Sequence, residues 1–132
     1  MYLNVCLYII MILHFIFICF LGLTPFFGPN WMMSIYLLIG PFLMAHWYCN
    51  NNTCAMTIIE YKIREKIYGP TKRGDCFMSR LIDPIYEINQ NHPAYANVFY
   101  FIITILCAVC AYKLITRYRR SELKDIYDFY RK

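Results

Sequence analysis

The stretch VCLYIIMILHFIFICFLGL, residues 5–23, decides the fold class of this chain. About 20 predominantly apolar residues are needed for a helix to cross the hydrocarbon core of a bilayer, and this stretch comes close to that length. A cleaved signal peptide fits less well, because no basic region precedes the stretch and its apolar core is longer than the usual range. We therefore predict a first membrane span over residues 5–23 that is kept in the mature protein.

The composition of the whole chain supports a membrane protein. Of its 132 residues, 60% are hydrophobic and only 16% are charged, whereas about a quarter are charged in soluble domains. The first charged side chain in the sequence is Glu60. We predict an all-α integral membrane protein that forms a single membrane domain over residues 1–132.

A second span is predicted directly after the first. The segment TPFFGPN, residues 24–30, contains two prolines and a glycine, which end a helix and favour a tight turn. The two spans should therefore form a hairpin. The second span is predicted over residues 31–48, with Trp31 at one end and Trp47 and Tyr48 at the other, as is typical of aromatic belts at membrane interfaces. Gly40 and Pro41 predict a kink in its middle.

A third span is predicted over residues 94–115, after an interfacial loop over residues 49–93 and before a basic tail over residues 116–132. Three spans place the short turn and the tail on the same side of the membrane. Basic residues close to a span mark the cytoplasmic side and attract anionic lipid, so we expect a cytoplasmic tail. The residues concerned are Lys113, Arg117, Arg119 and Arg120.

The stretch HWYCNNNTCAMTIIEYKIREK, residues 46–66, has two structural interpretations. If the second helix continues through it, polar residues recur at intervals of three and four and form one stripe, typical of an amphipathic helix at the membrane interface. The alternative is that the asparagine run forms a loop in which Asn52 caps a new helix. The polar stripe of the first interpretation consists of His46, Asn50, Thr53, Thr57, Glu60 and Arg64.

Two further short helices are expected. One lies near residues 77–81 in the otherwise irregular loop. The other lies in the tail, where Ser121 can cap an amphipathic helix that would bind lipid or a protein partner through one face. That face consists of Leu123, Ile126, Tyr127 and Tyr130.

The sequence contains no phosphate-binding glycine loop and no common hydrolase or metalloprotease motif, so we expect no enzyme, no cofactor, no metal and no nucleic acid partner. His14 is an ionisable residue inside the first span, where such residues are candidates for proton paths. Because the span offers no acidic partner, we expect a hydrogen-bonded structural histidine.

A CxxC pair at Cys107 and Cys110 gives the alternative from another class. It resembles the intramembrane CxxC of membrane thiol oxidoreductases of the vitamin K epoxide reductase type. Those enzymes pair the CxxC with loop cysteines, a role that Cys49 and Cys54 would have here. The resemblance implies a membrane thiol-disulfide oxidoreductase, although those enzymes have four helices and a longer chain.

A second resemblance covers about twenty residues of the stretch that begins at His46. It is similar to the HW..NNNTCALT..E pattern of small multi-span membrane proteins of large nucleocytoplasmic DNA viruses, with Met56 in place of the usual leucine. A looser form occurs in small bacterial membrane proteins. The residues that carry it are His46, Trp47, Asn51, Asn52, Thr53, Cys54, Ala55, Thr57, Glu60 and Arg64.

The viral resemblance implies a structural role. The chain would belong to a virion's internal membrane, or to a membrane of the endoplasmic-reticulum type during assembly, and would anchor that membrane to a capsid. The motif and the tail face are then the expected surfaces for capsid or membrane proteins.

Overall fold

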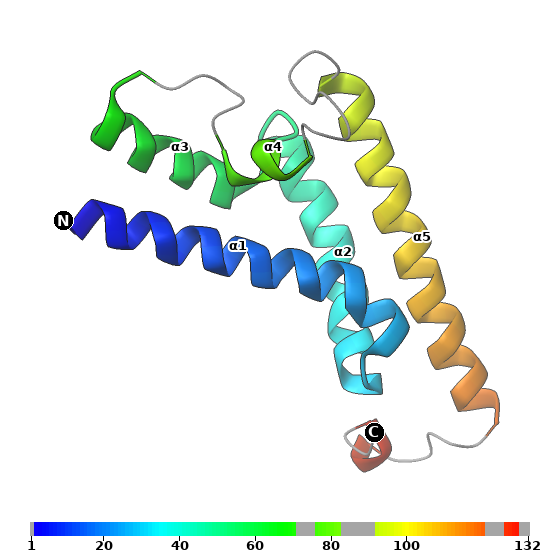
Figure 1. Cartoon of the computed structure of the whole chain (residues 1–132). Coiled ribbons are helices and arrows are strands. Elements are labelled where there is room, and N and C mark those ends of the chain that lie inside the picture. Colours follow the sequence, from blue (N-terminus) through cyan, green and yellow to red (C-terminus); the bar gives the residue numbers. More distant parts are fainter. Residues whose placement is uncertain (1, 71–75, 83–91, 121–125, 130–132) are drawn as a thin grey trace. The chain divides into compact units, whose positions relative to one another are not determined.

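A computed structural model of the chain describes residues 2–70, 76–82, 92–120 and 126–129. The elements are α1 (Tyr2–Phe27), α2 (Asn30–Cys49), α3 (Ala55–Tyr68), α4 (Phe77–Ile82), α5 (His92–Arg119) and the 3-10 helix η1 (Ile126–Phe129), drawn in Figure 1. Within these described ranges every regular element is a helix. The predicted all-α class is therefore confirmed.

Three of the helices are long and apolar enough to cross a membrane by length and composition: Tyr2–Phe27, Asn30–Cys49 and Ala96–Arg119. They coincide with the three predicted spans. Large apolar side chains stand on their outer surfaces, for example Leu38 at 76%, Phe42 at 72% and Phe101 at 66% exposure. Such surfaces are consistent with an integral membrane protein, because lipid tails cover apolar side chains that water would not.

The first helix ends later than its sequence predicts. Helix α1 continues over Thr24–Phe27 and holds Pro25 inside it. The chain then turns at Gly28, whose backbone N–H donates to the Thr24 carbonyl oxygen at 2.9 Å. A Cβ atom on Gly28 would lie 2.6 Å from that oxygen, so only glycine fits this close approach. The turn to α2 is therefore shorter than the segment TPFFGPN suggested.

The second helix continues through Gly40 and Pro41 as one element. The helix predicted near residues 77–81 is present as α4. In the tail, the described residues form the short 3-10 helix η1, while Ser121, Leu123 and Tyr130 lie outside the described residues.

The chain divides into two compact units, each described by itself. In the unit of Met1–Phe17 and His46–Val98, α3 and α4 lie against the first part of α1, as Figure 1 shows, with a contact between Arg64 and Met11. In the unit of Ile18–Ala45 and Phe99–Lys132, the rest of α1 packs on α2 through Phe20 and Tyr36, whose ring centroids are 5.9 Å apart. These units position two groups of polar contacts.

Candidate functional site

The asparagine run forms a turn between two helices. Helix α2 ends at Cys49 and α3 begins at Ala55, so the loop interpretation is confirmed and the continuous polar stripe is wrong. Asn51 and Asn52 have φ angles of 51° and 58°, in the left-handed region. Asparagine is enriched there among non-glycine residues, because its short polar side chain tolerates this conformation. The backbone of the turn thus accounts for the asparagine run.

His46 supplies the cap that was expected from Asn52. The residue at the N-cap position of α3 is Cys54, which makes no capping bond with its own side chain. Instead, the backbone N–H of Ala55 donates to His46 Nε2 at 3.1 Å. The imidazole must be unprotonated at Nε2 to accept this bond. At the other end of the turn, Asn50 Nδ2 donates to the His46 carbonyl oxygen at 2.8 Å, so His46 and Asn50 together join the end of α2 to the start of α3.

The remaining polar motif residues lie on the inner face of α3. Thr57, Glu60 and Arg64 are its three buried residues. Its exposed residues include Ile59 and three charged side chains, Lys62, Glu65 and Lys66. A helix lying on a membrane surface would turn its polar stripe to water. This stripe instead faces the protein, and its Thr53 lies in the preceding turn.

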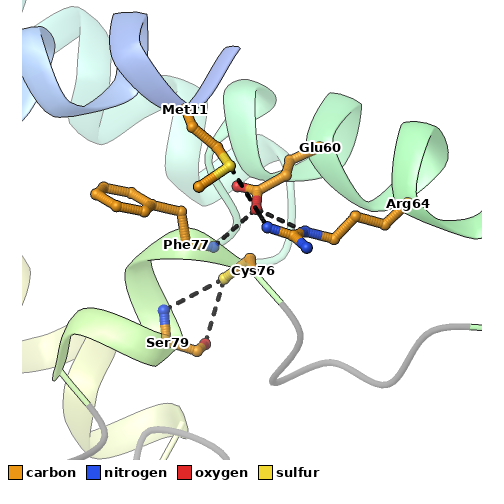
Figure 2. A network of polar contacts seen from close by, with 6 residues as sticks. All are labelled: Met11, Glu60, Arg64, Cys76, Phe77 and Ser79. Carbon is orange, nitrogen blue, oxygen red and sulfur yellow. Dashed lines mark hydrogen bonds and ion pairs between the residues drawn. The ribbon is translucent and has the colours of Figure 1, made fainter. Parts of the chain in front are cut away.

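Glu60 organises the inner face of α3, as Figure 2 shows. Its Oε1 atom accepts bonds from Arg64 Nε and from the backbone N–H of Phe77, each at 2.8 Å, and Arg64 Nη2 lies 2.8 Å from the same oxygen. Glu60 is 0% and Arg64 is 6% exposed. A buried charge of this kind needs a partner of opposite sign and further hydrogen bonds. Glu60 therefore ties the first residue of α4 to α3.

Residues of α1 and α4 complete this contact region, which we call the Glu60 cluster: Met11, Glu60, Arg64, Cys76, Phe77 and Ser79. Arg64 Nη2 lies 3.6 Å from Met11 Sδ, a weak acceptor. Cys76 Sγ donates to Ser79 Oγ at 3.3 Å, and the Ser79 backbone N–H donates to Cys76 Sγ at 3.4 Å. The Phe77 ring packs on His14, with 6.4 Å between ring centroids. The cluster thus joins α1, α3 and α4.

The second unit uses two basic residues of α5 to bind the turn between α1 and α2. Lys113 Nζ donates to the carbonyl oxygens of Pro25 at 2.6 Å and of Phe26 at 3.2 Å. Arg117 donates to the side-chain oxygen of Asn30. The last carbonyls of a helix have no partner within it and carry partial negative charge, so a cation is favourable there. Two of the four residues expected to contact anionic lipid therefore make contacts within the chain, while Arg119 and Arg120 are exposed.

The CxxC pair lies in the same unit. All seven cysteines are free, and Cys110 is 0% exposed. A Cβ atom placed on Gly40 would meet Cys107 Sγ directly, so Cys107 occupies the space that glycine leaves on α2. Cys49 is exposed and Cys54 is half-buried. Reactive cysteines need access to their partners, which the burial of Cys110 opposes.

The remaining predicted site residues are Trp47 of the motif and the residues of the tail face. Trp47 is buried, at 7% exposure, and belongs to the first unit. Tyr127 in the tail is 84% exposed. Ile126 begins η1, and Leu123 and Tyr130 of the predicted tail face lie outside the described residues.

Sequence reasoning missed several of these contacts. It singled out His14 but did not place it against Phe77, and it gave Met11 no role. It also treated Lys113 as a lipid contact. Lys113 and Arg117 are four residues apart and so share a helix face, which was the one local signal that they act together. In comparisons with protein-family models, with curated proteins and with solved structures, the chain matches none of them.

Proposed function

We propose that the chain is a structural membrane protein of three spans whose tail and turn regions anchor a membrane to a protein shell. The shell of this proposal is a viral capsid, and the membrane is the internal membrane of a virion. The capsid part of the proposal rests on the motif resemblance at His46–Glu60. The structural part rests on how the chain uses its polar residues.

The observation that supports the structural role is that motif residues make contacts within the chain that stabilise its fold. His46 caps α3, Glu60 binds Arg64 and the start of α4, and Asn51 and Asn52 shape the turn between α2 and α3. Each of these residues therefore stabilises the fold within the segment that carries the motif. A motif whose members stabilise a turn and a helix pair is what a compact membrane anchor requires.

The topology proposed for the anchor places the tail and the α1–α2 turn on the cytoplasmic side. Lys113 and Arg117 support a common side, because both bind the region around the turn. Arg119 and Arg120 are exposed beyond them, where they are available to anionic lipid headgroups or to an acidic partner.

The tail is the proposed contact with the shell. Tyr127 is 84% exposed on η1. Tyrosine is enriched among the residues that dominate protein interfaces, because it provides a large rigid contact area and a polar tip. Leu123 and Tyr130 are the sequence neighbours proposed to extend this contact.

Crosslinking mass spectrometry of the protein in its native membrane tests the proposal. We expect reproducible crosslinks from Lys124 or Lys132 to one abundant shell protein, with Cys107 and Cys110 reduced. The variant Tyr127→Asp should lose these crosslinks, whereas Tyr118→Asp serves as a control at an exposed tyrosine of α5.

The redox alternative makes the opposite prediction. Under it, the double variant Cys107→Ala with Cys110→Ala abolishes function, and a Cys107–Cys110 disulfide exchanges with Cys49 or Cys54. An anchor tolerates the double variant and depends on the tail. If Tyr127→Asp has no effect and the disulfide exchange is observed, the oxidoreductase would replace the anchoring proposal.

A further inference from the structure

Glu60 Oε2 and His14 Nδ1 are buried side-chain atoms of the first unit that have no hydrogen-bond partner among the described residues. Glu60 is 0% exposed and His14 is 4% exposed. Buried polar atoms are nearly always hydrogen-bonded, so each such exception calls for an explanation. The sequence led us to expect a hydrogen-bonded structural histidine at position 14, but His14 Nδ1 has no such bond among the described residues.

The two atoms belong to side chains that both lie against Phe77. The backbone N–H of Phe77 donates to Glu60 Oε1 at 2.8 Å, and the ring of Phe77 packs on the His14 ring at 6.4 Å between centroids. A buried histidine of α1 and a buried carboxylate of α3 therefore both lie against Phe77 of α4.

The bonding of Glu60 is one-sided. The guanidinium of Arg64 and the N–H of Phe77 all bind Oε1, which fixes the carboxylate in place. Its other oxygen, Oε2, keeps its lone pairs for a proton or for a donor that can give one. His14 Nδ1 is such a group, because imidazole both binds and releases protons near neutral pH.

The position of His14 along α1 gives the site its significance. His14 lies 12 residues after Tyr2 and 13 residues before Phe27, so it stands at the midpoint of this candidate span. That position is about 18 Å of helix from either end. Ionisable residues within membrane spans are rare, and chains of Asp, Glu and His there relay protons in pumps and transporters.

We propose that Glu60 and His14 form a proton-exchange site beside the midpoint of α1, a role beyond anchoring. One proton taken up from water resides on the imidazole or on Glu60 Oε2, and it passes between His14 Nδ1 and Oε2 directly or through one water molecule. The transfer leaves the net charge of the site unchanged, since a cationic imidazole and a carboxylate become a neutral imidazole and a carboxylic acid. The charged or titratable residues of the cluster in the described structure are Arg64 on α3, which is bonded to Glu60, and the Cys76 thiol, which directly precedes Phe77. His14 on α1 packs on the ring of Phe77.

Solid-state NMR on the full chain in phosphatidylcholine vesicles tests this site. The chain has three histidines and four glutamates, so labelling histidine with ¹⁵N and the glutamate carboxyl with ¹³C gives a spectrum in which each residue can be assigned. We expect magnetisation transfer between the Glu60 carboxyl carbon and His14 Nδ1. On acidification the two resonances should change over one shared pH range.

Variants separate coupling from coincidence. His14→Gln should move the pH range over which Glu60 titrates, and Glu60→Gln should move that of His14. Glu65→Gln, at an exposed residue on the same helix, should leave both unchanged. The proposal is overturned if Glu60 and His14 titrate independently or show no magnetisation transfer in the unmodified chain, a measurement that needs no variant to fold.

Discussion

Asn51 and Asn52 hold a backbone conformation that most side chains avoid. Their φ angles of 51° and 58° lie in the left-handed region, where a residue with a Cβ atom crowds the following carbonyl oxygen. Two such residues in sequence let the chain turn sharply between α2 and α3. The Asn52 N–H closes the turn by donating to the Trp47 carbonyl oxygen at 2.8 Å.

A substitution at Asn51 tests this account, because its side chain is exposed. We expect Asn51→Val to lower the free energy of unfolding by about 1–2 kcal/mol. This is the cost of the left-handed conformation for residues other than glycine, asparagine and aspartate. Asn51→Gly should be neutral, since glycine adopts this conformation freely. Thermal unfolding in detergent micelles measures both. Equal stability of the two variants would contradict a backbone origin for the asparagine run.

Arg64 is the residue on which the buried charge of Glu60 depends. Truncation as Arg64→Ala leaves an uncompensated carboxylate in the interior, and we expect a loss of about 3–5 kcal/mol in the free energy of unfolding. Lys62→Ala, at an exposed position two residues earlier, should change stability by no more than about 0.5 kcal/mol. The same unfolding assay compares them. Similar losses for both would contradict the dependence of Glu60 on Arg64.

At the scale of elements, α3 shows that an amphipathic pattern does not tell which face is buried. Its polar residues Thr57, Glu60 and Arg64 face α1 and α4, while Ile59 is 44% exposed. Three of the six residues of the predicted stripe share one face of this helix, while the stripe as a whole is interrupted by the turn before it. The partner that covers the stripe includes the N–H of Phe77, which periodicity in residues 55–68 cannot reveal.

Helices α2 and α5 approach each other at Gly40 and Cys107. Adding a methyl group by Gly40→Ala should cost about 1–3 kcal/mol through overpacking, because the new Cβ would meet Cys107 Sγ. Adding Cys107→Ala to that variant should recover most of the loss by removing the sulfur. Thermal unfolding of the single and double variants measures this coupling.

Gly22→Ala is the matched control for the Gly40 experiment. A Cβ atom at Gly22 meets nothing within 4 Å, so alanine there should be neutral or stabilising by up to about 1 kcal/mol through its better helix propensity. A loss at Gly22 as large as that at Gly40 would show that both effects arise in the helix backbone and that Cys107 plays no part.

At the scale of the whole molecule, the number of spans fixes where the chain ends lie. Three helices are long and apolar enough to cross a membrane, and an odd number of crossings puts the two ends on opposite sides. We expect an epitope tag at the amino end and one at the carboxyl end of the chain to be accessible from opposite faces of sealed vesicles. Protease protection of each tag measures this. Tags on the same face would mean that one of the three helices does not cross the membrane. That helix would then be α1, because the charged helix α3 packs against it.

Local information in the sequence determined the helical class and the places of the three long apolar helices, while at the asparagine run it left a continuous helix and a turn as alternatives. Hydrophobicity and backbone preference are properties of neighbouring residues, so they can be read from a short window. The same information failed at the end of α1, where the helix continues over Pro25 and ends at a turn that only Gly28 permits.

Only the tertiary structure decided which polar residues act together. Glu60 and Phe77 are 17 residues apart, and Lys113 and Pro25 are 88 apart, so no local pattern connects them. His46 likewise caps a helix that begins nine residues later. The physical reason is that a buried polar group takes whichever partner packing brings within about 3 Å, and packing is settled by apolar surfaces far from that group in the sequence.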